Sequence, residues 1–368
     1  MRVCVIGAGL AGSLLAWRLR LAVAPLGERL ELDVVCGPEA GDATDVSLGM
    51  VRGFESDAAN CRLAIDSLAE LHDDRRLAAW AGLQEQESVY VTAEASLDPA
   101  LRRLLPRLSA ACRTAGPDEL ARRYGIAGLA GGSVGILEPR AGLIEPRRLR
   151  RSVLAELARL RVPRIPGPID QVAVTDDQVV CRWHGRVRRY DAVVLATGRW
   201  TPRLLAASEL PVPPYRTKTI AFAWYVATGA PPYCFVDETT GLYGRPGPDR
   251  QLALGLRSTD WDVDPDRPPA DAALHHRAVE LARHRFPGMR LEPRPRVVTA
   301  ADCYTEPAGL ALRPVLDDAA PLYTFTGGSG GAVKTALAAS AVAARDLLAT
   351  SSGRERAHRT SISQGRLT

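Results

Sequence analysis

Three glycines near the start of the chain have the spacing of a pyrophosphate-binding turn. Gly7, Gly9 and Gly12 follow an apolar run at residues 3–6 and precede an apolar-periodic run at residues 14–19. This order predicts a buried strand, a tight turn and a helix. The first glycine allows the turn, the second admits a pyrophosphate, and the third lets the helix pack closely on the strand. We expect this turn to contact a dinucleotide through Gly7, Gly9, Leu10, Ala11 and Gly12.

The acid that usually binds the adenosine ribose is displaced in this sequence. The second strand is expected at residues 30–36, and its end is occupied by Cys36 and Gly37 instead of Asp or Glu. Glu39 is the nearest carboxylate, so the ribose contact is assigned to Glu39.

A second segment predicts further backbone contacts with a cofactor. Residues 190–198 form a short apolar strand that ends in Ala-Thr-Gly, a pattern typical of flavoproteins that bind two dinucleotides. Upstream, residues 142–146 (GLIEP) lead into a helix expected at about 147–160. Residues 169–181 and 182–193 are expected to form paired strands.

Taken together, these motifs resemble the D-amino-acid-oxidase family, and within it the sarcosine oxidase and glycine oxidase branch. The resemblance rests on five segments in the family's order and covers most of residues 1–350. They are GAGLAG at residue 7, GLIEPRRL at residue 142, DAVVLATGRWTPRLL at residue 191, residues 243–256, and YTFTGGSGGAVKTALAASAVAARDLL at residue 323.

The resemblance implies an α/β (α+β) fold with a Rossmann-like FAD-binding domain and a second, mixed or antiparallel-sheet substrate domain. We place the FAD-binding domain at 1–52, 137–205 and 297–350, and the substrate-binding domain at 53–136 and 206–296. The segment 351–368 lacks apolar periodicity and is expected to be a flexible tail.

The same resemblance implies FAD as the cofactor and assigns residues to it beyond the first glycine turn. These are Thr44, Ser47, Val172, Thr197, Gly198, Trp200, Gly328, Ser329, Gly330 and Gly331. The glycine turn at 327–331 and the alanine-rich helix after it would bring backbone groups and a helix dipole against the flavin.

Two cations are assigned to a substrate carboxylate because they match the family's pattern. Arg52 follows Ser-Leu-Gly-Met-Val, and Lys334 follows the last glycine-rich turn. A guanidinium binds a carboxylate bidentately and an ammonium adds a point charge. Tyr243 and Arg257 are further catalytic candidates, and Arg245 and Tyr304 are pocket candidates.

Two positions depart from the family. Many relatives attach FAD covalently through a cysteine just before a Tyr-Thr pair, whereas Cys303 lies one residue nearer to that pair. Non-covalent FAD and a buried free thiol are expected, with attachment through Cys303 as the alternative. Ala253 stands where relatives carry a lysine that helps O2 accept electrons, so Arg250 or Arg257 would assist, or the acceptor is not O2.

Composition narrows the class of protein. The chain has 368 residues with 46% hydrophobic side chains, which is ordinary globular composition. Only two of its 47 basic residues are lysines, so 45 are arginines, and they are spread along the chain, which argues against nucleic-acid binding. Seven dispersed cysteines indicate a reducing, cytoplasmic setting, and no pattern indicates a metal site, a signal peptide or a membrane span.

These observations favour an FAD-dependent oxidoreductase that converts an amino acid or N-substituted amino acid to an imine, which water hydrolyses. Electrons would pass to O2, giving H2O2, or to another acceptor, and the divergent pocket suggests specialised biosynthesis. Two alternatives stay open. One is an FAD enzyme that modifies a tRNA base, and the other is a flavin-binding subunit or dehydrogenase that does not use O2.

Overall fold

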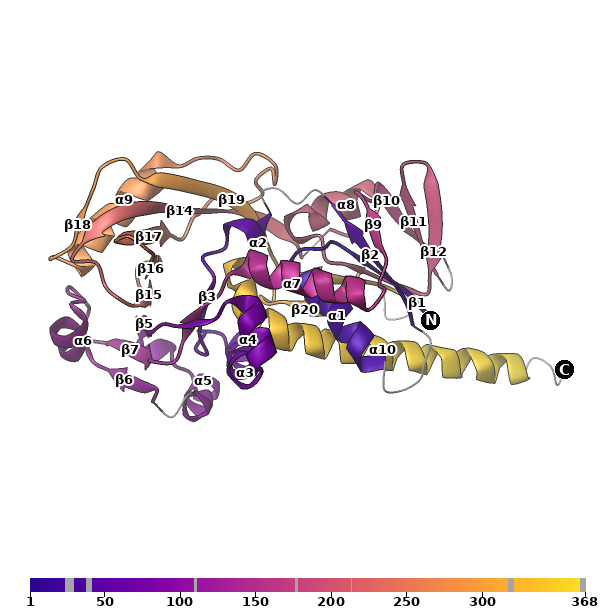
Figure 1. Cartoon of the computed structure of the whole chain (residues 1–368), viewed down its shortest axis with the longest axis horizontal. Coiled ribbons are helices and arrows are strands. Elements are labelled where there is room, and N and C mark those ends of the chain that lie inside the picture. Colours follow the sequence, from indigo (N-terminus) through magenta and orange to yellow (C-terminus); the bar gives the residue numbers. More distant parts are fainter. Residues whose placement is uncertain are drawn as a thin grey trace.

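The structure is a computed structural model that describes residues 1–23, 30–37, 42–108, 111–175, 178–212, 214–316 and 321–364, with side chains up to residue 350. Two large sheets lie at opposite ends of the molecule, and a long helix runs beneath one of them (Figure 1). The α/β fold class predicted from the sequence is confirmed.

The first sheet has six strands in the order β20-β21-β13-β1-β2-β9. Its neighbours pair in parallel except β20 and β21, which are antiparallel. The strands are β1 (Arg2–Ile6), β2 (Glu31–Cys36), β9 (Arg164–Pro166), β13 (Ala192–Leu195), β20 (Ala311–Pro314) and β21 (Leu322–Thr326).

Both faces of this sheet are covered because its strands are apolar on both sides. Val3 and Val5 pack in a core with the helices, whereas Cys4 and Ile6 pack in a second core on the other face. The helices are α1 (Leu10–Val23), α3 (Ala58–Asp73), α4 (Arg75–Ala81), α7 (Pro146–Arg159) and α10 (Ala332–Gln364). The opposite face carries β10 (Gln171–Val174), β11 (Val179–Trp183), β12 (Arg186–Tyr190) and α8 (Thr201–Ala207).

The second sheet is mixed and has nine strands. Its order is β18-β14-β17-β16-β15-β5-β7-β6, with β19 paired to β14. The strands are β5 (Ser88–Ala93), β6 (Arg113–Ala115), β7 (Ser133–Glu138), β14 (Arg216–Thr228), β15 (Cys234–Asp237), β16 (Leu242–Pro246), β17 (Gln251–Leu256), β18 (Arg290–Leu291) and β19 (Arg296–Tyr304). Only β5 and β15 pair in parallel among them.

Three groups of shorter elements complete the described chain. The helix α9 (Ala272–Arg285) covers one face of the nine-stranded sheet, and α6 (Pro117–Tyr124) lies at the far end of the sheet (Figure 1). The helix α5 (Pro99–Leu104) packs between β5 and α3. A small sheet of β3 (Met50–Val51), β8 (Gly142–Leu143) and β4 (Gln84–Glu85) lies between the two large sheets. Single turns are formed by α2 (Ala43–Val46), η2 (Glu94–Ser96), η3 (Leu105–Arg107), η4 (Gly198–Trp200) and η5 (Ser329–Gly331).

The strand β14 faces two environments because its side chains alternate. Ala221, Ala223 and Tyr225 pack against α9 in one core, whereas Lys218 and Ile220 point to the opposite face, where the large cavity lies. Of this strand, Lys218, Thr219, Ile220 and Phe222 line the cavity.

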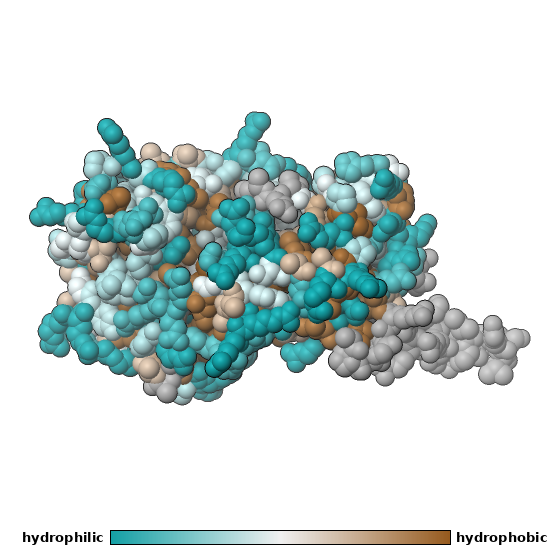
Figure 2. Space-filling view, in the orientation of Figure 1, coloured by the Kyte–Doolittle hydropathy of each residue, from teal (hydrophilic) through white to brown (hydrophobic). Residues whose placement is uncertain are grey.

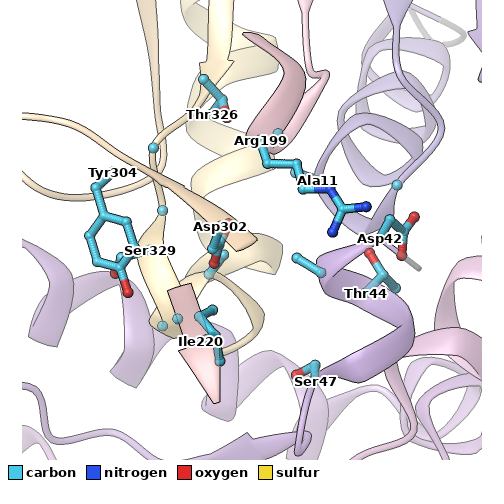
Figure 3. A pocket seen from close by; sticks show the side chains of 18 of the residues that line it. Ala11, Asp42, Thr44, Ser47, Arg199, Ile220, Asp302, Tyr304, Thr326 and Ser329 are labelled. Carbon is cyan, nitrogen blue, oxygen red and sulfur yellow. The ribbon is translucent and has the colours of Figure 1, made fainter. Parts of the chain in front are cut away.

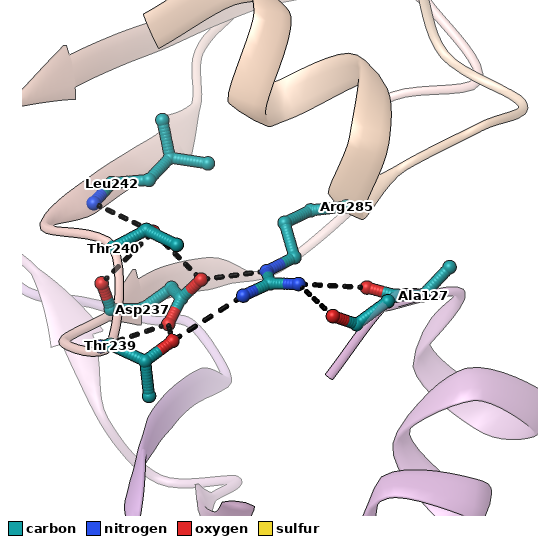
Figure 4. Close-up of polar contacts among 7 residues, drawn as sticks. Ala127, Asp237, Thr239, Thr240, Leu242 and Arg285 are labelled. Carbon is teal, nitrogen blue, oxygen red and sulfur yellow. Dashed lines mark hydrogen bonds and ion pairs between the residues drawn. The ribbon is translucent and has the colours of Figure 1, made fainter. Parts of the chain in front are cut away.

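A buried ion pair links α9, β15 and the loop after α6. Arg285 donates from Nε to Asp237 Oδ2 over 2.7 Å, and from Nη1 to the carbonyl oxygens of Ala127, at 3.3 Å, and Gly128 (Figure 4). Asp237 also accepts from the hydroxyl groups of Thr239 and Thr240. Every oxygen of the buried carboxylate therefore has a partner, as a buried charge requires.

Two features bear on the predicted domain boundaries, which stay a prediction. The segment 297–304 belongs to β19 of the nine-stranded sheet, and α3, from 58 to 73, packs against α10 beside the six-stranded sheet. The helix α10 continues to Gln364, so the backbone at 351–364 is helical where the sequence suggests a flexible tail.

Charged residues make up 24% of the chain, and the surface is correspondingly hydrophilic. Figure 2 shows hydrophilic side chains spread across one face of the molecule, with hydrophobic residues in smaller areas between them. In the described part of the chain, no helix is long and apolar enough to cross a membrane.

Candidate active site

A cavity of about 1420 Å³ lies between the two large sheets. It exceeds the roughly 300–1,000 Å³ of a typical small-molecule pocket, so it can accommodate a dinucleotide together with a small substrate. Most of the residues predicted to bind cofactor or substrate line it, although they come from distant parts of the sequence. They are Gly7, Gly9, Leu10, Ala11, Thr44, Ser47, Arg52, Thr197, Gly198, Trp200, Tyr243, Arg257, Gly328, Ser329, Gly330, Gly331 and Lys334.

The first glycine turn has the shape that phosphate binding needs. Gly7 has a φ of +113°, and a Cβ there would lie 2.3 Å from the carbonyl oxygen of Ala196. By contrast, a Cβ on Gly9 would meet nothing nearer than Thr44 Oγ1 at 3.6 Å, so this backbone is open to the cavity. The helix α1 begins next, at Leu10, and its N-terminus is a favourable place for an anion.

The helical turn α2 lines the cavity beside this glycine turn. Asp42 caps α2, and Thr44 Oγ1 accepts a hydrogen bond of 3.1 Å from the backbone of Leu10. Arg150 of α7 holds the turn through Asp42 at 2.6 Å and Asp45 at 3.2 Å. Burial raises the pKa of Asp42, although Arg150 opposes the shift. Thr44 is thereby fixed where the predicted phosphates would lie.

Arg199, which no sequence motif selected, extends across the cavity toward Asp42 (Figure 3). It is 8% exposed, its Nε lacks a hydrogen-bond partner, and burial lowers its pKa. A buried guanidinium with an unused donor fits an anionic group such as a pyrophosphate. Its position could have pointed to it in the sequence, because it directly follows Ala-Thr-Gly in a strand-to-helix turn.

The last glycine-rich turn forms the opposite wall. Gly327 has a φ of +80°, and a Cβ there would lie 2.4 Å from Thr305 Cγ2, so a side chain does not fit. Gly330 is open, with Tyr304 Oη 3.8 Å from its would-be Cβ. Next, α10 begins at Ala332, so this wall also presents a helix N-terminus to the cavity. Both glycine turns thus leave room for a ligand, and these residues fit FAD.

Arg52 and Lys334 meet on one carboxylate, that of Glu55. Glu55 Oε1 lies 2.8 Å from Arg52 Nη2 and 2.9 Å from Lys334 Nζ. Burial raises the pKa of Glu55, but the two cations outweigh it and the net shift is downward. Glu55 therefore stays ionised, and its carboxylate shows that the two cations can share an oxygen. No sequence motif selected Glu55, because only the fold brings α10 to it.

The local structure holds Arg52 rigidly. It is 4% exposed, its Nε donates to the carbonyl oxygen of Phe54 over 3.0 Å, and its guanidinium lies 4.9 Å from the ring centroid of Tyr90. The carboxylate of Glu138 accepts from the backbone of Gly53 at 2.8 Å and of Phe54 at 2.9 Å. Glu138 thus fixes the turn that presents Arg52.

Lys334 occupies a position that is electrostatically unfavourable for a cation. It lies in the first turn of α10, where the helix dipole disfavours a cation, and burial and Arg52 lower its pKa against the effect of Glu55. The carboxylate of Glu55 beside it offsets this cost.

Two aromatic candidates line the cavity between these walls. The ring of Tyr243 packs over Gly255, where a Cβ would lie 2.2 Å from it, and its hydroxyl donates to Ala221 O over 3.2 Å. Tyr304 lies beside Ser329 in Figure 3. Burial raises the pKa of both phenols, so both stay neutral at ordinary pH.

Strand alternation separates Cys303 from its neighbours. Asp302 and Tyr304 line the cavity, whereas Cys303 packs in the core with Cys4 and Ile6. Burial raises the pKa of the Cys303 thiol to about 12. Burial also raises the pKa of Asp302 to about 6, against the Cys303 backbone N–H and Arg199.

Three other predicted residues do not line the cavity. Gly12 does not line the cavity, because it allows close packing, and a Cβ there would lie 1.9 Å from Gly7 O. Val172 is in the core and its backbone donates to Ser208 Oγ over 3.0 Å. Arg245 also lies outside the cavity lining, over the ring of Trp224. Glu39 falls outside the described residues.

The described residues contain no group of three or more His, Cys, Asp or Glu side chains that could hold a metal ion.

Comparison with known proteins agrees with this architecture. The sequence model of the family described as FAD dependent oxidoreductase (DAO) matches residues 2–345. The chain therefore belongs to the D-amino-acid-oxidase family and is an FAD-dependent oxidoreductase. No curated protein matches the sequence significantly.

Solved structures with the same fold have low sequence identity to this chain. NikD, an unusual amino acid oxidase essential for nikkomycin biosynthesis, is 18% identical, with a TM-score of 0.70 over 93% of each chain. L-proline dehydrogenase from P. horikoshii is 12% identical, with a TM-score of 0.72 over 94% of this chain and 92% of that chain. Glycine oxidase from Geobacillus kaustophilus is 16% identical, with a TM-score of 0.66 over 94% of each chain.

Proposed function

We propose that the enzyme oxidises a carbon–nitrogen bond of an amino acid or N-substituted amino acid. The observation that carries this proposal is the convergence of Arg52 and Lys334 on one carboxylate oxygen of Glu55 inside the cavity. A substrate carboxylate would take over these contacts. Substrates of this kind are named for several proteins of the same fold, including an amino acid oxidase and a glycine oxidase.

The cofactor supplies the redox chemistry, since FAD accepts a hydride from carbon. The glycine turns at Gly9 and Gly330, with Thr44 and Arg199, would hold it in place. In the overall reaction the substrate loses a hydride from carbon and a proton from nitrogen. The resulting imine takes up water and gives a keto acid or aldehyde plus an amine or ammonia.

The protein's own contribution is binding and orientation. Arg52 and Lys334 fix the carboxylate end, which leaves the carbon beside nitrogen as the part that can be placed against the flavin. Tyr243 and Tyr304 stay neutral and flank the substrate space. No general base is needed if the amine binds unprotonated.

We propose O2, reduced to H2O2, as the electron acceptor. Ala253 is packed in an apolar cluster with Leu48 and Phe222, so no cation replaces the missing lysine at that position. Arg257 lines the cavity and is the candidate to assist O2. The buried free thiols of Cys4, Cys61, Cys181 and Cys234 support a reducing compartment such as the cytoplasm.

The test is reduction of the bound flavin without oxygen. The purified holoenzyme is mixed anaerobically with a panel of amino acids and N-substituted amino acids, and the visible absorbance of oxidised flavin is followed. Matched acids without nitrogen and matched amines without carboxylate serve as controls. We expect bleaching only by compounds with both groups. If none of them bleaches the flavin, or if amines without carboxylate do so equally well, the proposal is wrong.

A further inference from the structure

The two lysines of the chain line the same cavity. Lys334 is paired with Glu55, as described above. The other is Lys218, on the cavity face of β14, which no motif selected. In a chain with 45 arginines, two separate lysines at one cavity are an unexpected concentration.

Lys218 is a buried cation held by aromatic rings. It is 7% exposed, and its Nζ lies 4.5 Å from the ring centroid of Trp261 and 5.5 Å from that of Tyr304. The two rings contact each other edge to face, with centroids 5.2 Å apart. Cation–π contacts orient the ammonium, but they do not neutralise its charge.

The segment that carries Trp261 is bound to β14 by backbone hydrogen bonds. Thr219 N donates to Asp260 O over 3.1 Å, and Asp262 N donates to Thr217 O over 2.7 Å. The backbone of Trp261 is therefore fixed beside that of Lys218. Its ring, 40% exposed, covers the ammonium from the solvent side.

A second cation adds to the positive charge near Lys218. Arg257 follows β17 and lines the same cavity. Burial lowers the pKa of Lys218 most, Arg257 lowers it further, and Asp260 opposes them. In the part of the chain that the structure describes, no carboxylate forms an ion pair with Lys218 or Arg257.

The two pairs of cations therefore differ in one respect. An internal carboxylate, Glu55, contacts both Arg52 and Lys334. Lys218 is buried and Arg257 is exposed, and within the described residues neither has such a partner. Burying a charge is favourable only when an opposite charge or hydrogen bonds compensate it, so the site at Lys218 is suited to an anion from outside.

We propose that Lys218 and Arg257 bind a second carboxylate of the substrate. The preferred substrates are then dicarboxylic, either acidic amino acids or amino acids with a carboxyalkyl group on nitrogen. This inference rests on the proposed function, because Arg52 and Lys334 must bind the first carboxylate. Lys218 acts as a specificity-determining residue that selects substrate length.

The test compares matched ligands that cannot react. The oxidised holoenzyme is titrated with unbranched dicarboxylates of three to six carbons and with monocarboxylates of equal length, and binding is followed by the change in flavin absorbance. We expect one dicarboxylate to bind about tenfold more tightly than its monocarboxylate partner, or about 1.4 kcal/mol. Lys218→Met should abolish that advantage and leave monocarboxylate binding unchanged, whereas Lys218→Arg should retain most of it.

Each other outcome has a distinct meaning. Arg277→Met, an exposed arginine of α9, is the control for lost positive charge. If monocarboxylates bind but no dicarboxylate binds more tightly, or if Lys218→Met keeps the advantage, this inference is wrong and the proposed function stands. If no carboxylate of either series binds, both are wrong. If Lys218→Met weakens both series equally, its role is structural. If a phosphonocarboxylate alone shows the Lys218-dependent gain, the second anion is not a carboxylate.

Discussion

The ammonium of Lys334 lies 2.9 Å from the carboxylate of Glu55, inside the cavity that the sequence motifs share. The same oxygen of Glu55 contacts Arg52. A substrate carboxylate that binds these cations would therefore compete with an internal one for both of them.

Replacing Glu55 by glutamine should strengthen the binding of carboxylate ligands by about threefold to tenfold. The amide removes the competing charge but keeps the size of the side chain, and tenfold corresponds to about 1.4 kcal/mol. The measurement is a titration of the holoenzyme with a monocarboxylate, followed by flavin absorbance. Glu280→Gln, on the surface of α9, is the matched control. Weaker binding in Glu55→Gln would instead mean that Glu55 helps to hold the ligand.

Removing the charge of Lys334 should raise the apparent substrate constant by about one to two orders of magnitude. A hydrogen bond to a charged group contributes about 1.5–3 kcal/mol. Lys334→Met keeps the length of the side chain, and Lys334→Arg should restore part of the affinity. Steady-state and anaerobic titrations measure the effect. An unchanged constant in Lys334→Met would remove this residue from the binding site.

The flavin should be released when the protein is precipitated with acid. Cys303 faces the core, not the cavity, and its thiol pKa is raised to about 12 by burial, so it is a poor nucleophile. We expect yellow FAD in the supernatant and an unmodified chain by mass spectrometry. Cys303→Ser should bind flavin as wild type does. A yellow pellet that Cys303→Ser loses would establish covalent attachment.

Ionisation of the buried Asp302 carboxyl group should lower the stability of the folded protein as the pH rises from about 4 to 6. Its pKa is raised from 3.8 to about 6 by burial, so the folded state holds a proton that the unfolded state releases. Below pH 4 the carboxyl group is protonated in both states, and its stabilising contribution is fully present. Above pH 6 that contribution is lost, and the free energy of unfolding is lower by about 3 kcal/mol, at 1.36 kcal/mol per pKa unit.

The check on Asp302 is urea unfolding of the holoprotein at several pH values. Asp302→Asn cannot ionise, so it should show a flatter pH dependence than wild type and greater stability at pH 7. Asp118→Asn, in the first turn of α6, controls for a lost surface carboxylate. Parallel pH profiles for wild type and Asp302→Asn would contradict the assignment.

Breaking the buried pair of Arg285 and Asp237 should destabilise the protein by about 3–5 kcal/mol, because one charge is left buried without its partner. Arg285→Met and Asp237→Asn are measured by chemical denaturation, singly and together. The double variant should lose less than the sum of the single losses. Arg283→Met, exposed on the same helix, should change stability little. Additive losses would show that the two residues act independently.

The sequence alone determined the parts of the site that are encoded locally. The glycines of the first turn, the strand ending at Gly198 and the glycine-rich turn before α10 could all be recognised because each depends on adjacent residues. Their backbone geometry follows from glycine's lack of a side chain. The family, its cofactor and the α/β fold were implied by the resemblance that these motifs carry.

Only the tertiary structure decided which charges meet. Glu55 contacts Lys334 because α10 packs against α3, which follows Glu55, and no local pattern encodes that contact. Lys218 faces the cavity because β14 alternates, and it gains its aromatic partners because a distant segment pairs with that strand. Side-chain direction follows from strand period, but the identity of the neighbour depends on long-range packing, which a sequence motif does not contain.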